Sequence, residues 1–241
     1  MGLSVSGVGV IDKAVAVLAA LEAAPRSLSE LVAATGFSRA TAHRLAVALE
    51  AHGLVRRDED SRFALGVRLI ALGRAATEAI PLAEAAMPAL AALRDETAES
   101  VQLYVRDGER RVCIAALESP HGLRTIVAMG ASLPLDVGSA GRILSTSSAP
   151  PLTSPVGNES VPNRRRWAES VGEREAGVAS VSAAVLASDG TVVAAVSVSG
   201  PIERTTREPG RRYGEAVVAA AQRIEQAAGL TVGQTAGQTA G

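Results

Sequence analysis

Residues 27–55 read SLSELVAATGFSRATAHRLAVALEAHGLV, and this stretch decides the fold of the N-terminal part of the chain. Ser27 and Glu30 have the Ser-x-x-Glu spacing of a capping box, which begins a helix. Gly36 ends that helix, because glycine adopts the left-handed conformation at little cost. Ser38 then caps a second, longer helix. The pattern predicts two helices joined by a sharp turn.

A two-stranded wing is expected directly after the second helix. Residues 54–57 and 62–65 read as short strands, and the acidic residues 58–61 form a tight turn between them. Together these elements make a winged helix-turn-helix, whose second helix enters the major groove of B-DNA. The alternative is an ordinary helical hairpin with solvated arginines. It does not account for the agreement between caps, turn glycine, wing and arginine positions.

Candidate DNA contacts lie at the N-terminal, outward side of the second helix and on the wing. Side chains at the start of a recognition helix reach base edges, while arginines bind phosphates and set the register. The net charge of −1 does not by itself indicate nucleic acid, so the prediction depends on where the arginines lie. The candidates are Ser38, Arg39, Ala40, Thr41, His43 and Arg44 on the helix, and Arg56, Arg57 and Arg62 on the wing.

Composition limits the other possibilities. The 241 residues are enough for two domains, and 47% are hydrophobic but only 2% aromatic, so the core must consist of Ala, Val, Leu and Ile. Cys113 is the only cysteine, which excludes an intramolecular disulfide and a cysteine-based metal cluster. The three histidines lack metal-ligand spacing, so we expect no metal and no cofactor. Without a recognisable signal peptide or membrane-spanning apolar run, a cytoplasmic protein with no membrane contact is expected.

Hydrophobic periodicity predicts further helices. Residues 66–77 continue from the wing as a connecting helix, whose apolar side packs either on its own domain or on a second subunit. Residues 82–97 are helical but contain Pro88, which should kink the helix or start it afresh. Residues 8–23 form an amphipathic helix that lies across the helix-turn-helix pair. Its inward side is expected to consist of Val10, Ile11, Ala14, Val15, Val17, Leu18 and Leu21.

The second half of the chain reads as a β-rich domain with helices at both ends. Alternating segments at residues 100–106 and 111–117 flank an Asp-Gly turn, and residues 178–187 and 191–199 flank another. Residues 123–128 are a further strand candidate.

The connections between these strands are predicted as follows. A loop is expected at residues 130–136, and a helix with small residues in its first turn at residues 138–146. The Pro- and Ser-rich residues 147–162 should be irregular. Residues 163–171 read as a short basic helix that holds the only tryptophan. Residues 212–228 form a final amphipathic helix.

A ligand pocket is indicated in this half. The helix that begins near Gly138 would direct free N–H groups at a carboxylate. Ser180 and Ser182 share one face of their strand, as do Ser197 and Ser199 on theirs. These hydroxyls either line a polar cavity or are satisfied by the backbone.

Four stretches are similar to the IclR family of bacterial transcription regulators and cover nearly the whole chain. The first runs from residue 8 through the winged helix to residue 66. The others are GASLPLDVGSAGRIL (130–144), EREAGVASVSAAV (173–185) and VVAAVSVSGPIERTT (192–206). The details resemble most an actinobacterial branch associated with amino-acid metabolism, including leucine biosynthesis.

The resemblance implies an α+β fold and a ligand-responsive regulator of metabolic genes, either a repressor or one with dual action. It implies a homodimer, or a dimer of dimers, on a palindromic double-stranded DNA operator. The effector is expected to be a small organic acid or amino acid. The implied parts are a winged helix-turn-helix domain (1–65), a linker helix (66–79), a GAF-like α/β effector-binding domain (80–228) and a disordered tail (229–241).

Carried over residue by residue, the resemblance also implies where the effector binds. The chain departs from the family pattern at three positions: Ser170 stands where relatives often have an acidic group, Ser180 where many have cysteine, and Ala184 where proline is usual. A relative's ligand is therefore not transferred. The implied pocket residues are Leu133, Ser139, Ala140, Ser170, Val178, Ser180, Ser197 and Ser199.

Two other classes of function fit parts of the sequence. Sulfoxide-reducing enzymes with a GAF-like domain rely on several cysteines, whereas this chain has one and no recognisable Ser-His-Asp cluster. We therefore predict that it is not an enzyme. A structural DNA binder without a ligand would differ from a regulator by showing no thermal shift with small molecules.

Overall fold

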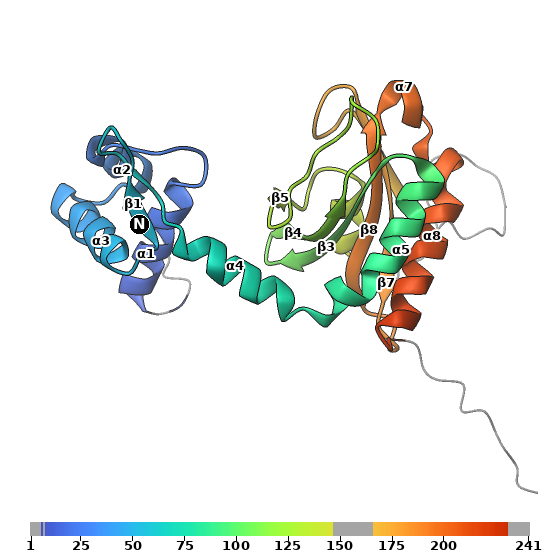
Figure 1. The fold of residues 1–241 in the computed structure, drawn as a ribbon, viewed down its shortest axis with the longest axis horizontal. Coiled ribbons are helices and arrows are strands. Elements are labelled where there is room, and N and C mark those ends of the chain that lie inside the picture. Colours follow the sequence, from blue (N-terminus) through green and yellow to red (C-terminus); the bar gives the residue numbers. More distant parts are fainter. Residues whose placement is uncertain (1–5, 7, 147–165, 231–241) are drawn as a thin grey trace, which may run out of the picture. The chain divides into compact units, whose positions relative to one another are not determined.

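The computed structural model describes residue 6, residues 8–146 and residues 166–230. The chain divides into two compact units, Met1–Ala79 and Ile80–Gly241, each with a hydrophobic core of its own. The first unit is mainly helical and the second contains a six-stranded sheet (Figure 1), which confirms the mixed α+β fold. None of the helices in these described ranges is long and apolar enough to cross a membrane.

Local capping signals determine the helices of the first unit. The Ser27 hydroxyl accepts from the backbone N–H of Glu30 at 3.3 Å, and the Glu30 carboxylate accepts from the N–H of Ser27 at 2.7 Å, so the predicted capping box is confirmed. Gly36, with a φ of 70°, ends the helix as predicted. The elements of this unit are α1 (Gly9–Ala20), α2 (Leu28–Thr35), α3 (Arg39–Ala51), β1 (Val55–Arg57), β2 (Phe63–Leu65) and α4 (Arg68–Glu78).

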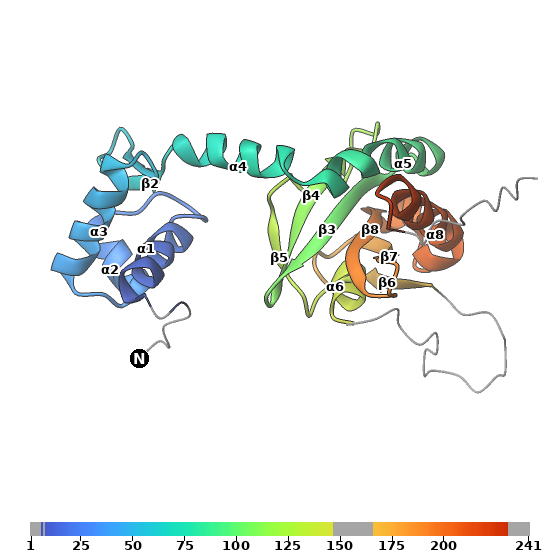
Figure 2. The same cartoon turned by 90° about the horizontal axis from the view of Figure 1, so that it is seen from below.

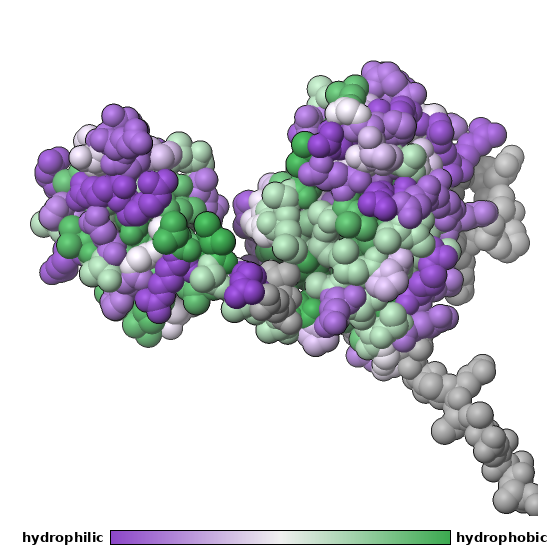
Figure 3. Space-filling model, viewed as in Figure 1, coloured by the Kyte–Doolittle hydropathy of each residue, from purple (hydrophilic) through white to green (hydrophobic). Residues whose placement is uncertain are grey.

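The expected inward side of α1 is wrong in part. Val10, Ile11 and Val15 are 53–62% exposed, whereas Val17 and Leu21 are buried against α2 and α3. The buried positions recur at i and i+4 on one face, and Ile11 and Val15 lie further round the helix, away from that face. Apolar residues therefore reach the surface of the first unit (Figure 3).

The apolar side of α4 is exposed as well. Val67, just before this helix, and Ile70 and Leu72 within it are each at least half exposed. Of the two alternatives left open by the sequence, packing of these side chains on their own domain is thus wrong.

The second unit is an antiparallel sheet with helices on both faces. The strand order is β5-β4-β3-β8-β7-β6. Helices α5 and α8 lie side by side over one face, and α6 packs on the other (Figures 1 and 2). The elements are α5 (Pro81–Thr97), β3 (Ser100–Asp107), β4 (Arg110–Leu117), β5 (Ser132–Pro134), α6 (Ser139–Leu144), β6 (Trp167–Val171), β7 (Val178–Leu186), β8 (Val192–Pro201), α7 (Ile202–Thr205) and α8 (Pro209–Ala227).

The two Asp-Gly hairpins are confirmed, but their surroundings differ from expectation. Residues 123–128 form no strand; instead β5 lies within the stretch that was expected to be a loop. Gly130 donates its N–H to the carbonyl of Cys113 at 2.7 Å, so β4 is already paired by the chain that leads into β5. Strand β8 continues through Pro201, two residues beyond the strand end predicted at residue 199, and the short α7 follows it.

The expected basic helix around Trp167 is also wrong. Residues 167–171 form the edge strand β6, while residues 163–165 lie outside the described ranges. The reason is tertiary: an added Cβ at Gly210 or Gly214 of α8 would come within 1.9 or 2.4 Å of the Trp167 ring. The indole occupies the space left by these two glycines, and this packing holds the segment extended on the sheet.

Four further expectations concern helices, a loop and the tail. Helix α5 runs through Pro88 as a single element and does not start afresh. Burial of Ala86, Ala89, Leu90 and Leu93 against the sheet offsets the hydrogen bond that proline removes. Helix α8 begins at Pro209, three residues before the predicted start. The irregular loop expected at residues 147–162 and the disordered tail from residue 231 on lie outside the described residues.

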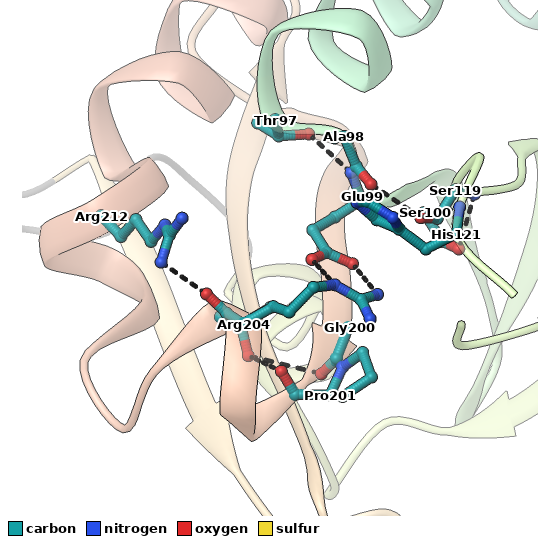
Figure 4. A network of polar contacts seen from close by, with 11 residues as sticks. Thr97, Ala98, Glu99, Ser100, Ser119, His121, Gly200, Pro201, Arg204 and Arg212 are labelled. Atoms are coloured by element: carbon teal, nitrogen blue, oxygen red, sulfur yellow. Dashed lines mark hydrogen bonds and ion pairs between the residues drawn. The ribbon is translucent and has the colours of Figure 1, made fainter. Parts of the chain in front are cut away.

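A buried ion pair joins the start of β3 to α7 (Figure 4). The Glu99 carboxylate accepts from Arg204 Nε at 2.6 Å and from Arg204 Nη2 at 2.8 Å, which raises the pKa of Arg204. Arg212 Nη1 donates to the Arg204 carbonyl at 2.6 Å. An added Cβ at Gly200 would lie 2.3 Å from Glu99 Oε2, so β8 must carry glycine there. The pair therefore fixes the end of β8 against β3.

Candidate DNA-contacting helix and ligand cavity

Helix α3 presents its polar side to solvent because its apolar side is packed. Ala42, Leu45 and Leu49 are buried in the core of the first unit. The Ser38 hydroxyl accepts from the N–H of Thr41 at 3.3 Å and donates to its hydroxyl at 2.9 Å. These two candidate DNA contacts therefore also fix the start of the helix.

Some of the remaining candidate side chains are free, and others are bound to residues of the protein itself. Ala40 and His43 are exposed on α3. Arg39 and Arg44 on α3 and Arg56 on β1 are exposed, and they form no salt bridge or hydrogen bond with any described residue. Such guanidinium groups can bind phosphate or base edges without first breaking a protein contact.

Arg57 and Arg62 on the wing are held by the protein itself. Arg62 Nη2 donates to Glu30 Oε2 at 2.7 Å and to the Pro25 carbonyl at 3.0 Å. Arg57 lies 3.9 Å over the ring of Phe63 and donates to the Ser61 carbonyl at 3.0 Å. The sequence does not distinguish these two arginines from the free ones.

In the second unit, a polar row crosses the sheet beneath α6. Ser182 pairs with Ser197 across β7 and β8, and Ser197 pairs with Gln102 on β3. The Ser139 hydroxyl on α6 lies 2.7 Å from those of both Ser180 and Ser182, and Ser182 donates to Ser197 at 2.9 Å. The hydroxyls thus bond one another, and Ser139, Ser180 and Ser197 among them line a cavity of about 30 Å³.

The cavity brings together most of the predicted effector residues. Leu133 is the exception: it pairs with Arg111 across β5 and β4 and packs in the apolar cluster beneath α6. The predicted residues that line the cavity are Ser139, Ala140, Ser170, Val178, Ser180, Ser197 and Ser199.

Sequence reasoning missed other residues that line the same cavity. Gln102 and Tyr104 share one face of β3, and a glutamine within an otherwise apolar alternation was a usable signal. Arg111 gave no such signal, because an arginine at the start of a strand after a turn is usually exposed. The residues missed are Gln102, Tyr104, Arg111, Arg174 and Glu175, whereas Gly138 lines the cavity at the helix start that the sequence indicated.

Arg111 is the most buried charged group of the cavity wall, with 3% of its surface exposed. Its Nη1 donates to the carbonyls of Val137, at 2.7 Å, and of Pro134. Burial lowers the pKa of Arg111, and the positive charge of Arg174 acts in the same direction. Burial also raises the pKa of Tyr104, so its phenol stays neutral and keeps a proton that it can donate to a ligand.

The start of α6 is less open than predicted. The backbone N–H of Gly138 donates to Glu173 Oε2 at 3.1 Å, and the other oxygen of that carboxylate binds Arg142. This amide, which the sequence assigned to a ligand carboxylate, is therefore bound by the protein's own carboxylate.

The two units together define a class of protein. A winged helix that presents free arginines is a DNA-binding module, and a polar cavity in a separate unit is a place for a small molecule. No cluster of His, Cys, Asp or Glu that could hold a metal occurs within residues 8–146 and 166–230. The arrangement is that of a ligand-responsive transcription regulator.

Comparison with known families identifies the chain more closely. Residues 10–59 match the IclR helix-turn-helix domain, and residues 74–151 and 162–226 match the C-terminal domain of bacterial IclR transcriptional regulators. The chain belongs to the IclR family. Members of this family are transcriptional regulators and not enzymes.

Individual relatives agree with this assignment. The chain is 26% identical to the transcriptional repressor IclR of Escherichia coli (strain K12) over 84% of its own length and 83% of the relative's. A transcriptional regulator of Rhodococcus sp. RHA1 is 25% identical, with a TM-score of 0.67 over 92% of this chain and 98% of that one. An IclR homologue of Microbacterium hydrocarbonoxydans, solved with 4-hydroxybenzoate, has the same fold, with 20% identity and a TM-score of 0.68 over 91% of this chain and 98% of that one.

Proposed function

We propose that this regulator is a repressor of metabolic genes that binds a palindromic operator through α3. The observation that carries the proposal is the exposed side of α3, on which Arg39 and Arg44 have no partner among the described residues. Ser38, Thr41 and His43 lie beside them and would reach base edges. The name of the Escherichia coli relative supports the sign of regulation.

We propose further that the chain acts as a dimer, or as a dimer of dimers. The apolar side chains of α1 and α4, among them Ile11, Val15 and Ile70, are exposed in the single chain, and pairing with a second copy would bury them. A palindromic operator requires two such winged helices related by a two-fold axis. The working parts would be the DNA-binding domain (1–65), the linker helix (66–79) and the effector-binding domain (80–228).

The cavity in the second unit is the proposed effector site. Seven of the eight residues implied by the family resemblance line it, and the relative from Microbacterium hydrocarbonoxydans binds 4-hydroxybenzoate, an organic acid. An organic acid or amino acid is therefore the proposed effector. The link to an actinobacterial branch and to leucine biosynthesis stays a prediction from the sequence.

The test is operator binding by the full-length protein. Genome-wide mapping would supply bound DNA, and gel-shift titrations at fixed salt would compare Arg44→Ala with wild type. Loss of one good base or phosphate contact should weaken binding by about 1–3 kcal/mol, which is about 5- to 150-fold.

Arg62→Ala is the matched control, because Arg62 is already bound to Glu30 and Pro25. It should change operator affinity less than Arg44→Ala does. Unchanged binding by a folded Arg44→Ala protein would contradict the proposed role of α3.

A further inference from the structure

We propose that Arg111 is the anchor for a carboxylate of the effector, and that the cavity selects an acid without an ammonium group. This inference rests on the proposed function and deepens it, because it chooses between organic acids and amino acids. It also assigns a binding role to a residue outside the set implied by the family resemblance.

The hydrogen bonds of Arg111 leave part of its guanidinium unused. A guanidinium has five N–H donors. Both hydrogen bonds of Arg111 come from Nη1, and the buried Nε has no partner among the described residues. Nη2 likewise makes no hydrogen bond within the described part of the chain. Nε and Nη2 are adjacent donors on the edge of the guanidinium that a carboxylate binds with two parallel hydrogen bonds.

No buried acid of the described residues compensates the charge of Arg111. The buried carboxylates are Glu99, which pairs with Arg204, and Glu225, which accepts from the backbone N–H of Leu186. Neither lines the cavity. The exposed Asp136 acts on Arg111 through its charge, and the guanidinium lies 5.5 Å from the ring centre of Tyr104, but neither side chain forms a hydrogen bond with it. A buried charge without a hydrogen-bonded carboxylate is costly, so an anion that binds this guanidinium gains a favourable interaction.

The other charges around the cavity favour an anion over a zwitterion. Arg174 adds a second positive charge, and the only described acid in the lining is the exposed Glu175, 3.8 Å from Arg174. Ser170, which also lines the cavity, is uncharged. An ammonium group would therefore meet hydroxyls and a nearby guanidinium, without a buried carboxylate to bind it.

The size of the cavity fits a small polar group. Its volume of about 30 Å³ holds about two water molecules, which is comparable to one carboxylate group. Glycines leave room for the guanidinium: an added Cβ would lie 2.8 Å from Arg111 Nη1 at Gly141 and 3.3 Å from Nη2 at Gly138. The guanidinium thus lies against the first turn of α6, whose Ser139 lines the same cavity.

The first experiment uses the wild-type full chain and pairs of compounds that share a carbon skeleton and differ in one charged group. Thermal-shift and calorimetric titrations would compare 4-hydroxybenzoate with 4-hydroxybenzamide, lactate with lactamide, and 4-methylpentanoate with L-leucine. We expect acids to bind. For each acid that binds, the affinity of the amide or amino acid paired with it should be at least about 30-fold lower. Equal binding within a pair, tighter binding of leucine, or no binding by any acid would overturn the proposal.

The second experiment changes the anchor and an exposed neighbour in parallel. Arg111→Gln keeps a hydrogen-bond donor but removes the charge. It should lower the affinity for the acid that binds best by about 30-fold or more. Arg110→Gln is the control, because Arg110 is exposed and bonds only Ser132 among the described residues. Acid binding by a folded Arg111→Gln protein at wild-type strength would refute the role of Arg111.

If Arg111→Gln does not fold, Arg111→Lys and the wild-type pairs decide the question. The lysine variant keeps the positive charge and should keep the preference for acid over amide, and loss of that preference in a folded protein would count against the charge as its cause. Operator binding, measured on the same preparations, separates the two proposals. If an amide releases the protein from DNA and the corresponding acid does not, the regulatory function stands and the role of Arg111 in carboxylate binding is wrong. A protein that binds no DNA but still prefers acids over amides would overturn the regulatory function and leave the role of Arg111 standing.

Discussion

Removing either partner of the Glu99–Arg204 pair should have unequal effects on stability. The Glu99 side chain is 2% exposed and that of Arg204 is 28% exposed. Arg204→Met leaves a fully buried carboxylate without its charged partner, which costs about 3–5 kcal/mol. Glu99→Gln leaves a guanidinium that can reach water and a neutral acceptor that can still bind it, at a cost of about 1–2 kcal/mol. The difference of about 2 kcal/mol is about 30-fold in the unfolding equilibrium.

The only tryptophan of the chain makes this difference measurable. Trp167 lies on β6 against α8, within the second unit, so its fluorescence in a urea titration reports that unit and is insensitive to the first. The slope of each transition should equal that of wild type, so that midpoints convert directly into free energies of unfolding.

The double variant tests the electrostatic reasoning itself. Glu99→Gln combined with Arg204→Met leaves no buried charge, and it should be more stable than Arg204→Met alone. The argument would be refuted if the double variant lost as much unfolding free energy as the two single variants lose together. So would an Arg204→Met protein that is as stable as Glu99→Gln.

Three further predictions concern the second unit. Gly141→Ala would place its Cβ 2.1 Å from the Leu135 carbonyl oxygen and should cost about 1–3 kcal/mol or more in the same urea assay, whereas Gly122→Ala, with open space around it, should be neutral. Burial raises the pKa of the Cys113 thiol to about 11, so iodoacetamide at pH 8 should label it only after unfolding; because the folded pKa is raised, stability should fall as pH rises from about 9 towards 11. Ser170→Asp would place a carboxylate in the wall of the cavity and should weaken acid binding in calorimetric titrations; stronger acid binding would contradict the charge argument.

The first unit could be predicted closely because its signals are local. The capping box at Ser27 and Glu30, the left-handed Gly36 and the cap at Ser38 each act within a few residues of their own position. The sequence could not show which arginines are free to contact DNA and which are bound by other residues. Whether Arg62 is free depends on Glu30, 32 residues away in the sequence.

The second unit was predicted less well because its elements depend on distant partners. Trp167 lies in a strand because Gly210 and Gly214 receive its ring, and no pattern within residues 163–171 reveals this. The serine alternation did reveal the cavity face, since β-strand periodicity alone places Ser180 and Ser182 together. Arg111 became recognisable only when its burial was known.

The contacts of Arg111 also connect the cavity to a neighbouring segment. Its Nη1 donates to the carbonyl of Pro134, at the end of β5, and to that of Val137, between β5 and α6. A carboxylate that draws the guanidinium towards itself weakens these bonds, and one that binds Nε and Nη2 in place strengthens them by fixing the group. An acid that binds one arrangement of this segment more tightly than another meets the physical requirement for a ligand to shift a conformational equilibrium. Backbone hydrogen exchange at residues 134–139, with and without a bound acid, should therefore change more than exchange on α5, where no contact to the cavity exists among the described residues.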